Sequence, residues 1–266
     1  MSTTATTRGS AKRWGPLWGA RPRDWAINEE QQLPTYEEAL RRLDLPAGRR
    51  VLEVGCGTGV FLRAAADRRL EVVGLDASAA LLELARERVP DAELHVGDME
   101  ALPFSDATFD AVAGFNCFFF AEDLVAALRE AGRVAKRGAP VVIQVWGRPE
   151  HCDLEAMKNV ARRYLPPPPA GASPPPPLWQ PGVLEGLATH AGLVPKTAFD
   201  ISWAYVYPDD DTLARALLSV GGIASISDPE EEAAVRAEIL EAVAPYRTPD
   251  GGYRLGNEFH FLIASA

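Results

Sequence analysis

The sequence has few cysteines, no long apolar run and no excess of positive charge. Its three cysteines (Cys56, Cys117 and Cys152) lack the number and spacing of a disulfide framework, which fits a reducing compartment. The net charge of −10 argues against a nucleic acid partner, because phosphate contacts call for clustered lysine and arginine. The longest aromatic stretch, 115–120, is interrupted by polar residues, and no segment is long enough to span a bilayer. We therefore expect a cytoplasmic protein without membrane insertion.

The 266 residues, 47% of them apolar, suit one domain with insertions or a small cap. The first residues are rich in threonine and serine and lack the apolar core of a signal peptide. Further along, Pro166–Pro177 is a proline run that favours a polyproline connector, although such runs also bind partners. The predicted organisation is a disordered tail (1–13), an N-terminal helical extension or lid (14–46), a core (47–147) and the remainder of the sheet (148–266) with cap insertions at 148–182 and 209–250.

Apolar runs alternate with helical patterns through the core, which predicts a doubly wound α/β sheet. The run at 140–146 is almost continuously apolar, as expected in the middle of a covered parallel sheet. A helical pair is expected at 209–245, broken at Gly221-Gly222. The predicted strands are 51–54, 71–75, 93–96, 110–114, 140–146, 199–207 and 255–264. The predicted helices are 34–43, 60–67, 78–89, 124–134, 152–164 and 183–190.

One stretch, Val51-Leu-Glu-Val-Gly-Cys-Gly-Thr-Gly59, reads as a strand, a glycine turn and a helix start. Glycines there allow positive φ angles and let the backbone approach a ligand closely. Asp76 ends the next predicted strand, seventeen residues after Gly59. An acidic side chain at that point is placed to accept hydrogen bonds from ribose hydroxyls. The two features together predict a pocket for an adenosine-containing cofactor.

These residues belong to a longer set of motifs, each at the end of a predicted strand. The set is Glu53-x-Gly55-x-Gly57-x-Gly59, Asp76, Gly97-Asp98-Met-Glu-Ala-Leu-Pro-Phe104 and Phe109-Asp110. It resembles class I S-adenosylmethionine-dependent methyltransferases (methyltransferase type 11), most closely the branch with the ubiquinone/menaquinone C-methyltransferases. The resemblance is close over residues 48–147. It implies a Rossmann-like, seven-stranded, mostly parallel sheet with an antiparallel last strand and helical cap insertions. It also implies S-adenosylmethionine as cofactor and S-adenosylhomocysteine as product.

The resemblance implies a role for several residues. Glu53 anchors the loop or the methionine amino group, Asp76 binds the ribose, and Asp98 accepts from the adenine amine. The alternatives are a buried carboxylate bonded to amides for Glu53, a helix N-terminal acid for Asp76 and a turn former for Asp98. Met99 is expected against the adenine ring, and Phe115 and Asn116 beside the methionine moiety. The expected cofactor-binding set is Glu53, Gly55, Cys56, Gly57, Thr58, Gly59, Asp76, Ala77, Asp98, Met99, Phe115 and Asn116.

Methyl transfer requires alignment of acceptor, methyl and sulfur, and exclusion of water; a general base is needed only when the acceptor must lose a proton early. His151, just past the fifth strand, is the candidate base, or else a solvated loop residue. No histidine or cysteine pair has metal-ligand spacing, so no metal is expected. Aromatic side chains are expected to wall the acceptor pocket, although core packing is an alternative for them. They are Trp18, Trp25, Tyr36, Phe120, Trp146 and Trp179.

The predicted function is S-adenosylmethionine-dependent methylation (EC 2.1.1.-) of a C, O or N nucleophile on a small organic acceptor, aromatic, quinone-like or a natural product. The protein is expected to act as a monomer or homodimer. One alternative is a homologue that binds the cofactor without transferring a methyl group, as a cyclase or regulator. An NAD(P)-dependent oxidoreductase is a second alternative, which Val60 disfavours because it stands at the third glycine of the dinucleotide motif. A protein methyltransferase is a third alternative. A deep cap disfavours it, because the cap would obstruct a folded protein acceptor.

Overall fold

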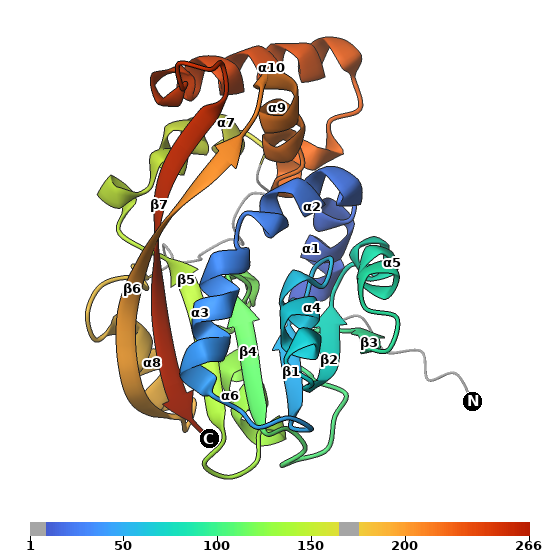
Figure 1. Ribbon diagram of the computed structural model, residues 1–266, viewed down its shortest axis with the longest axis vertical. Helices are drawn as coiled ribbons and strands as arrows, with labels where there is room; N and C mark the ends of the chain where they lie inside the picture. Colours follow the sequence, from blue (N-terminus) through green and yellow to red (C-terminus); the bar gives the residue numbers. More distant parts are fainter. Residues whose placement is uncertain (1–8, 165–175) are drawn as a thin grey trace.

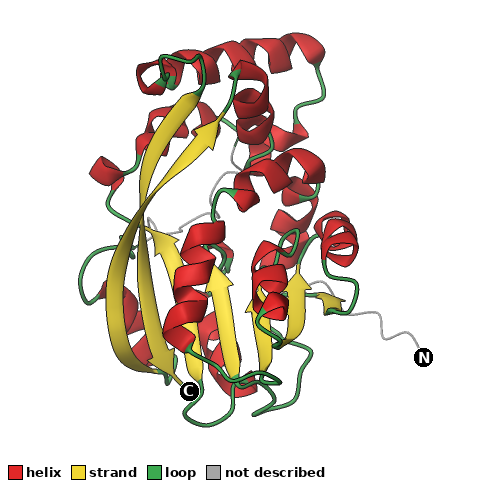
Figure 2. Ribbon diagram, in the orientation of Figure 1, coloured by secondary structure: helices red, strands yellow, loops and turns green. Residues whose placement is uncertain are grey.

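The computed structural model describes residues 9–164 and 176–266, and its centre is one seven-stranded sheet covered by helices on both faces (Figures 1 and 2). The strand order is β3-β2-β1-β4-β5-β7-β6, and β7 is antiparallel to both of its neighbours. The predicted fold class is therefore confirmed. The strands are β1 (Arg50–Val54), β2 (Glu71–Asp76), β3 (Glu93–Val96), β4 (Ala111–Phe115), β5 (Pro140–Trp146), β6 (Val194–Tyr207) and β7 (Tyr253–Ser265).

Two apolar clusters, one on each face of the sheet, form the core. Successive residues of a strand point to opposite faces, so Val51 joins one cluster and Leu52 the other. The first face is covered by α3 (Leu33–Leu43), α4 (Val60–Asp67) and α5 (Ala79–Arg88), and the second by α6 (Leu124–Val134) and α8 (Val183–His190). Both faces of the central strands are thus buried, and because β1 to β5 run parallel, their carboxyl ends meet at one edge of the sheet.

The N-terminal extension forms α1 (Ser10–Trp18) and α2 (Pro22–Glu30), which lie above the sheet (Figure 1). Helix α1 begins at Ser10, so the segment predicted to be disordered up to residue 13 is helical from residue 10, while residues 1–8 lie outside the described part. The reason is tertiary. Carboxylates from a distant loop, on Asp98 and Glu100, accept hydrogen bonds from the first backbone amides of α1.

The cap is built on the last two strands. The first half of β7, up to Glu258, pairs only with β6, and this two-stranded arm carries α9 (Asp210–Leu218) and α10 (Pro229–Ala242). Figure 1 shows these helices at the top of the view, beyond the parallel strands β1 to β5. The predicted helical pair is confirmed, with a 3₁₀ turn at Gly221–Ser225 between its members.

The segment predicted as one helix at 152–164 is instead a series of short turns, and this prediction was wrong. Two 3₁₀ turns (Pro149–His151 and Asp153–Met157) precede a short α7 (Lys158–Arg162). The Asp153 carboxylate accepts from the amide of Gly256 on β7 at 2.6 Å, so the segment is tied to the strand. Most of the proline run at 166–177 lies outside the described residues.

Within the described residues, no helix is both long and apolar enough to cross a membrane.

Candidate functional site

A cavity of about 520 Å³ lies at the carboxyl ends of the parallel strands, beneath α1, α2 and the cap. This is where open α/β sheets bind ligands. Each central strand contributes the loop that follows it. These loops bring Gly55, Gly57, Asp76, Ala77, Met99, Phe115 and Asn116 of the predicted cofactor set to the cavity wall. The others, Glu53, Cys56, Thr58, Gly59 and Asp98, lie outside the lining.

The glycine loop after β1 needs its glycines for two reasons. Gly55, Gly57 and Gly59 have φ angles of 70°, 51° and 82°, which side chains other than glycine rarely adopt. A Cβ atom on Gly55 would also lie 2.6 Å from the Cβ of Cys117, and one on Gly57 would lie 2.5 Å from the Oε2 of Glu29. Cys117 and Glu29 therefore occupy the space that side chains at Gly55 and Gly57 would need.

Two of the predicted acids, Asp76 and Glu53, lie at the ends of the strands next to this loop. Asp76 accepts hydrogen bonds from the amides of Gly57 (2.9 Å) and Ser78 (2.8 Å). Glu53 is 2% exposed, and its Oε2 has no hydrogen-bond partner among the described residues. Burial, together with the charges of Glu29 and Asp76, raises the pKa of Glu53 well above its ordinary value. A buried carboxylate without a donor is costly unless it holds a proton or meets a cation.

A third acid, Glu29 on α2, lines the cavity beside them and was not predicted from the sequence. Its carboxylate accepts from the amides of Thr58 (2.7 Å) and Val60 (3.2 Å). Burial raises its pKa, and these hydrogen bonds oppose the rise. Nothing in the local sequence of α2 shows this contact, because its partners lie about thirty residues further along the chain.

Asp98 binds the N-terminus of α1. Its carboxylate accepts from the hydroxyl of Ser10 (3.2 Å) and the amide of Ala11 (2.8 Å), while its neighbour Met99 lines the cavity. Each carboxylate oxygen has two lone pairs, so a further donor can still bind. The start of α1 consequently covers the part of the cavity that the resemblance assigns to adenine.

Buried amides join the N-terminal helices to the strand ends. The Oε1 of Gln32 accepts from the amide groups of both Asn116 (3.1 Å) and Gln144 (3.2 Å). Asn116 has a φ angle of 50°, and its Oδ1 is buried without a partner among the described residues. Such an orphan acceptor next to a cavity is suited to a ligand donor.

All six aromatic residues predicted for the acceptor pocket line the cavity, together with Trp14, Phe119 and Tyr205. The Trp18 ring lies 4.6 Å from that of Trp25 and 5.4 Å from that of Phe120, which joins α1, α2 and the loop after β4. Among the described lining residues there is no arginine, lysine or histidine. The chamber is therefore mainly apolar, with its charges confined to carboxylates.

Two tyrosine hydroxyls in this wall are not used by the described structure. Tyr36 and Tyr205 are each 3% exposed and line the cavity, yet neither hydroxyl has a hydrogen-bond partner in the described part of the chain. Tyr207 differs from them, because its hydroxyl donates to Asn28 at 2.7 Å and it does not line the cavity.

His151 does not line the cavity. Its Nδ1 lies 2.7 Å from the Oε2 of Glu258, its side chain is 45% exposed, and the same carboxylate binds Arg148. The hydrogen bonds from Arg148 and then from His151 lower the pKa of Glu258 to about 2. His151 therefore belongs to a cluster with Arg148 and Glu258, outside the cavity lining.

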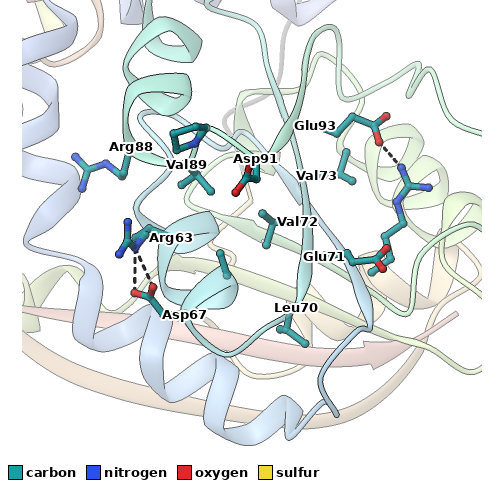
Figure 3. A pocket seen from close by; sticks show the side chains of 13 residues that line it. Arg63, Asp67, Leu70, Glu71, Val72, Val73, Arg88, Val89, Asp91 and Glu93 are labelled. Atoms are coloured by element: carbon teal, nitrogen blue, oxygen red, sulfur yellow. Dashed lines mark hydrogen bonds and ion pairs between the residues drawn. The ribbon is translucent and has the colours of Figure 1, made fainter.

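A second cavity, of about 580 Å³, lies beside the start of β2 (Figure 3). Arg63 pairs with Asp67 at 3.0 Å, and Arg50 pairs with Glu93. It contains none of the glycine loop and lies away from the strand ends that form the first cavity. Four of its charged side chains are paired in this way, and Arg88 pairs with Glu30 outside the lining.

Comparison with known proteins finds methyltransferases among the proteins that this chain resembles. Residues 52–143 match a family model described as a methyltransferase domain. A demethylmenaquinone methyltransferase from Renibacterium salmoninarum is 39% identical over 65% of this chain and 66% of its own length. A dTDP-4-amino-2,3,4,6-tetradeoxy-D-glucose N,N-dimethyltransferase from Saccharopolyspora spinosa is 32% identical over 50% of this chain and 53% of its own length. The matched part of the chain thus spans 66% of the length of the first relative and 53% of the length of the second.

Solved structures share the fold. A Bacillus halodurans protein described as a methyltransferase has a TM-score of 0.59 at 17% identity, covering 86% of this chain and 97% of its own. The [4+2]-cyclase SpnF has a TM-score of 0.58 at 21% identity, covering 88% and 80%. These structures show the Rossmann-like fold, and the match of residues 52–143 to a methyltransferase domain confirms the resemblance predicted from the motifs.

Proposed function

We propose that the protein is an S-adenosylmethionine-dependent methyltransferase that acts on a small, largely apolar acceptor without a negative charge. The observation that carries this proposal is the continuity of one cavity, which runs from the glycine loop and its acids to an aromatic chamber. A cofactor bound at the loop would present its reactive end to a molecule held in the chamber. The lack of described basic side chains in the lining disfavours a phosphate or carboxylate acceptor.

The residues present fit the cofactor. The orphan Oδ1 of Asn116 suits the positively charged amino group, to which the resemblance also assigns the buried Glu53, and Asp76 retains lone pairs for ribose hydroxyls. Met99 and Ala77, with α1 above them, suit the adenine ring. Gly55 and Gly57 lie in the cavity lining between these groups, where the chain that links them would pass. When bound, the cofactor supplies an electrophilic methyl group on a sulfonium.

The protein's own contribution is orientation and exclusion of water. The aromatic walls enclose the acceptor, and Tyr36 and Tyr205 can donate hydrogen bonds to an oxygen or nitrogen of it. Fixing both reactants in one enclosed cavity removes most of the entropic barrier to a two-body displacement. No histidine of the described residues lines the cavity, so an acceptor that must lose a proton would depend on the lining carboxylates or on these hydroxyls.

The nicotinamide alternative is disfavoured by Glu29. Dinucleotide pyrophosphates bind at the N-terminus of the helix that follows β1. Here the first free amides of that helix, α4, already bond to the Glu29 carboxylate. A second anion at the same place would meet like charge. The cyclase or regulatory alternative would use the same cofactor residues, so only an activity measurement separates it from methyl transfer.

The test is calorimetric titration with S-adenosylmethionine, S-adenosylhomocysteine and, as a control, NADH. We expect micromolar binding of the first two and none of the third. Acceptors are then screened by transfer of a labelled methyl group, with uncharged aromatic compounds compared with their carboxylated analogues. Folded protein that binds neither sulfur compound contradicts the proposal. Binding without transfer to any acceptor favours the cyclase or regulatory role. We further propose that it acts in the cytoplasm as a monomer or homodimer, without nucleic acid.

A further inference from the structure

Glu29 caps a helix to which it does not belong. The amides of Thr58 and Val60 at the start of α4 have no partner within that helix, and both donate to the Glu29 carboxylate. Glu29 is 4% exposed, so these bonds are shielded from water. A helix N-terminus carries a partial positive charge that a carboxylate stabilises.

The loop cannot supply such a cap itself. The N-cap position of α4 is Gly59, which has a φ angle of 82° and no side chain to accept a hydrogen bond. A Cβ atom there would lie 3.2 Å from the Cβ of Ala85 on α5, so a serine or aspartate in its place would be both strained and crowded. The conformation of the glycine loop therefore depends on a side chain delivered by α2.

Helix α2 is attached to the cap at its other end. The guanidinium of Arg21 donates to the carbonyl oxygens of Ala224 (3.2 Å) and Ile226 (2.9 Å) and pairs with Glu232 on α10. Asp24 pairs with Arg215 on α9 at 2.7 Å. One short helix thus spans the distance between the cap and the glycine loop.

We propose that Glu29 is a positioning residue that couples the cap to the cofactor loop. With the cap closed, Glu29 holds the amides of Thr58 and Val60 and so fixes the loop in its binding form. When α2 moves with the cap, Glu29 leaves, the loop relaxes and the cofactor is released. Because such coupling is reciprocal, an acceptor that favours the closed cap also tightens cofactor binding. This inference rests on the proposed function, since it concerns the same cofactor site.

The test compares S-adenosylhomocysteine affinity, by calorimetry, in wild type, Glu29→Gln and Glu37→Gln. The amide variant keeps the size of the side chain but cannot accept from both loop amides, so we expect its affinity to fall on the order of 10-fold. Hydrogen exchange of residues 55–60 should quicken in the same variant. Glu37 is an exposed glutamate on α3, so its variant controls for the loss of one negative charge.

A distal variant separates coupling from simple capping. Arg21→Gln loosens α2 from the cap without touching the cavity lining, and we expect it to weaken S-adenosylhomocysteine binding several-fold. Unchanged affinity in this variant overturns the coupling, even if its melting temperature falls. If Glu29→Gln does not fold, the Arg21 variant decides alone. Wild-type protein that fails to bind contradicts the proposed function, whereas wild-type binding with unaffected variants contradicts only the role of Glu29.

Discussion

A Cβ atom added to Gly57 would lie 2.5 Å from the Oε2 of Glu29, although Gly57 follows a strand of the sheet and Glu29 lies on an N-terminal helix. Gly57 is in the loop after β1, with a φ angle of 51°, and Glu29 comes down onto it from α2. The glycine therefore has a role beyond permitting a left-handed turn. It leaves the space in which a buried carboxylate reaches the loop amides.

Gly57→Ala should reduce both stability and cofactor affinity. The left-handed conformation costs an alanine about 1–2 kcal/mol, and the added methyl group also displaces Glu29. We expect S-adenosylhomocysteine affinity to fall at least about 10-fold. Gly138→Ala is the matched control, because Gly138 has a φ angle of 78° with nothing near its absent Cβ atom. It should lose similar stability while its affinity stays the same. Equal affinity in both variants would show that the space at Gly57 is irrelevant.

Glu53 should make the stability of the ligand-free protein depend on pH. Its pKa is raised in the folded state from the ordinary value of 4.5, mainly by burial. The folded state therefore keeps a proton that the unfolded chain releases above that value. The stabilisation this proton gives is present at low pH and is lost as pH rises through the raised pKa, by at most about 1.4 kcal/mol per pH unit.

Glu53→Gln removes this titration while Glu29 and Asp76 remain to titrate in both proteins. We expect the free energy of unfolding in urea to fall less for the variant than for wild type between about pH 5 and pH 8. The variant should also bind S-adenosylmethionine more weakly, because an amide cannot lose a proton to pair with the ammonium group as a carboxyl group can. Parallel pH curves for the two proteins would mean that Glu53 is ionised in both states.

The sheet and the cofactor side of the cavity could be predicted from sequence because their signals are local. A glycine loop follows an apolar strand directly, and Asp76 ends the next strand. The strands could also be predicted locally, because apolar runs alternate with helical patterns along the sequence. Residues 10–13 were predicted to be disordered but are helical. Their helix is capped by Asp98 and Glu100, almost ninety residues away, so no local signal shows it.

The side chains contributed by other layers were the ones that sequence could not assign. Glu29 is one of two adjacent glutamates in a polar helix, and only the packing of α2 distinguishes it from its neighbour Glu30, which pairs with Arg88 at 3.0 Å. For His151, the position expected from sequence differs from the position in the structure. Its position after β5 suggested a base near the site, but Glu258 and Arg148 hold it in an ion-pair cluster outside the lining.

His151→Ala should therefore leave methyl transfer nearly unchanged. The variant loses one hydrogen bond to Glu258, which keeps its bonds to Arg148, so we expect a loss of stability of at most about 1 kcal/mol. Turnover should stay within about 2-fold of wild type, measured with the acceptor found by screening. A fall on the order of 10²-fold at constant cofactor affinity would restore the general-base role.

Tyr205 and Tyr207 lie two residues apart on β6 and should respond in opposite ways to loss of the hydroxyl. Tyr207 donates to Asn28, so Tyr207→Phe strands a buried acceptor and should cost about 1–3 kcal/mol of stability. Tyr205 has no partner in the described structure, so Tyr205→Phe should cost almost nothing or stabilise the fold. If the hydroxyl binds the acceptor, that variant should instead lose on the order of 10-fold in kcat/KM. Chemical denaturation gives the free energy of unfolding of each variant, and acceptor kinetics give its kcat/KM. Unchanged kinetics in Tyr205→Phe would remove this hydroxyl from acceptor recognition and leave Tyr36 to be tested in the same way.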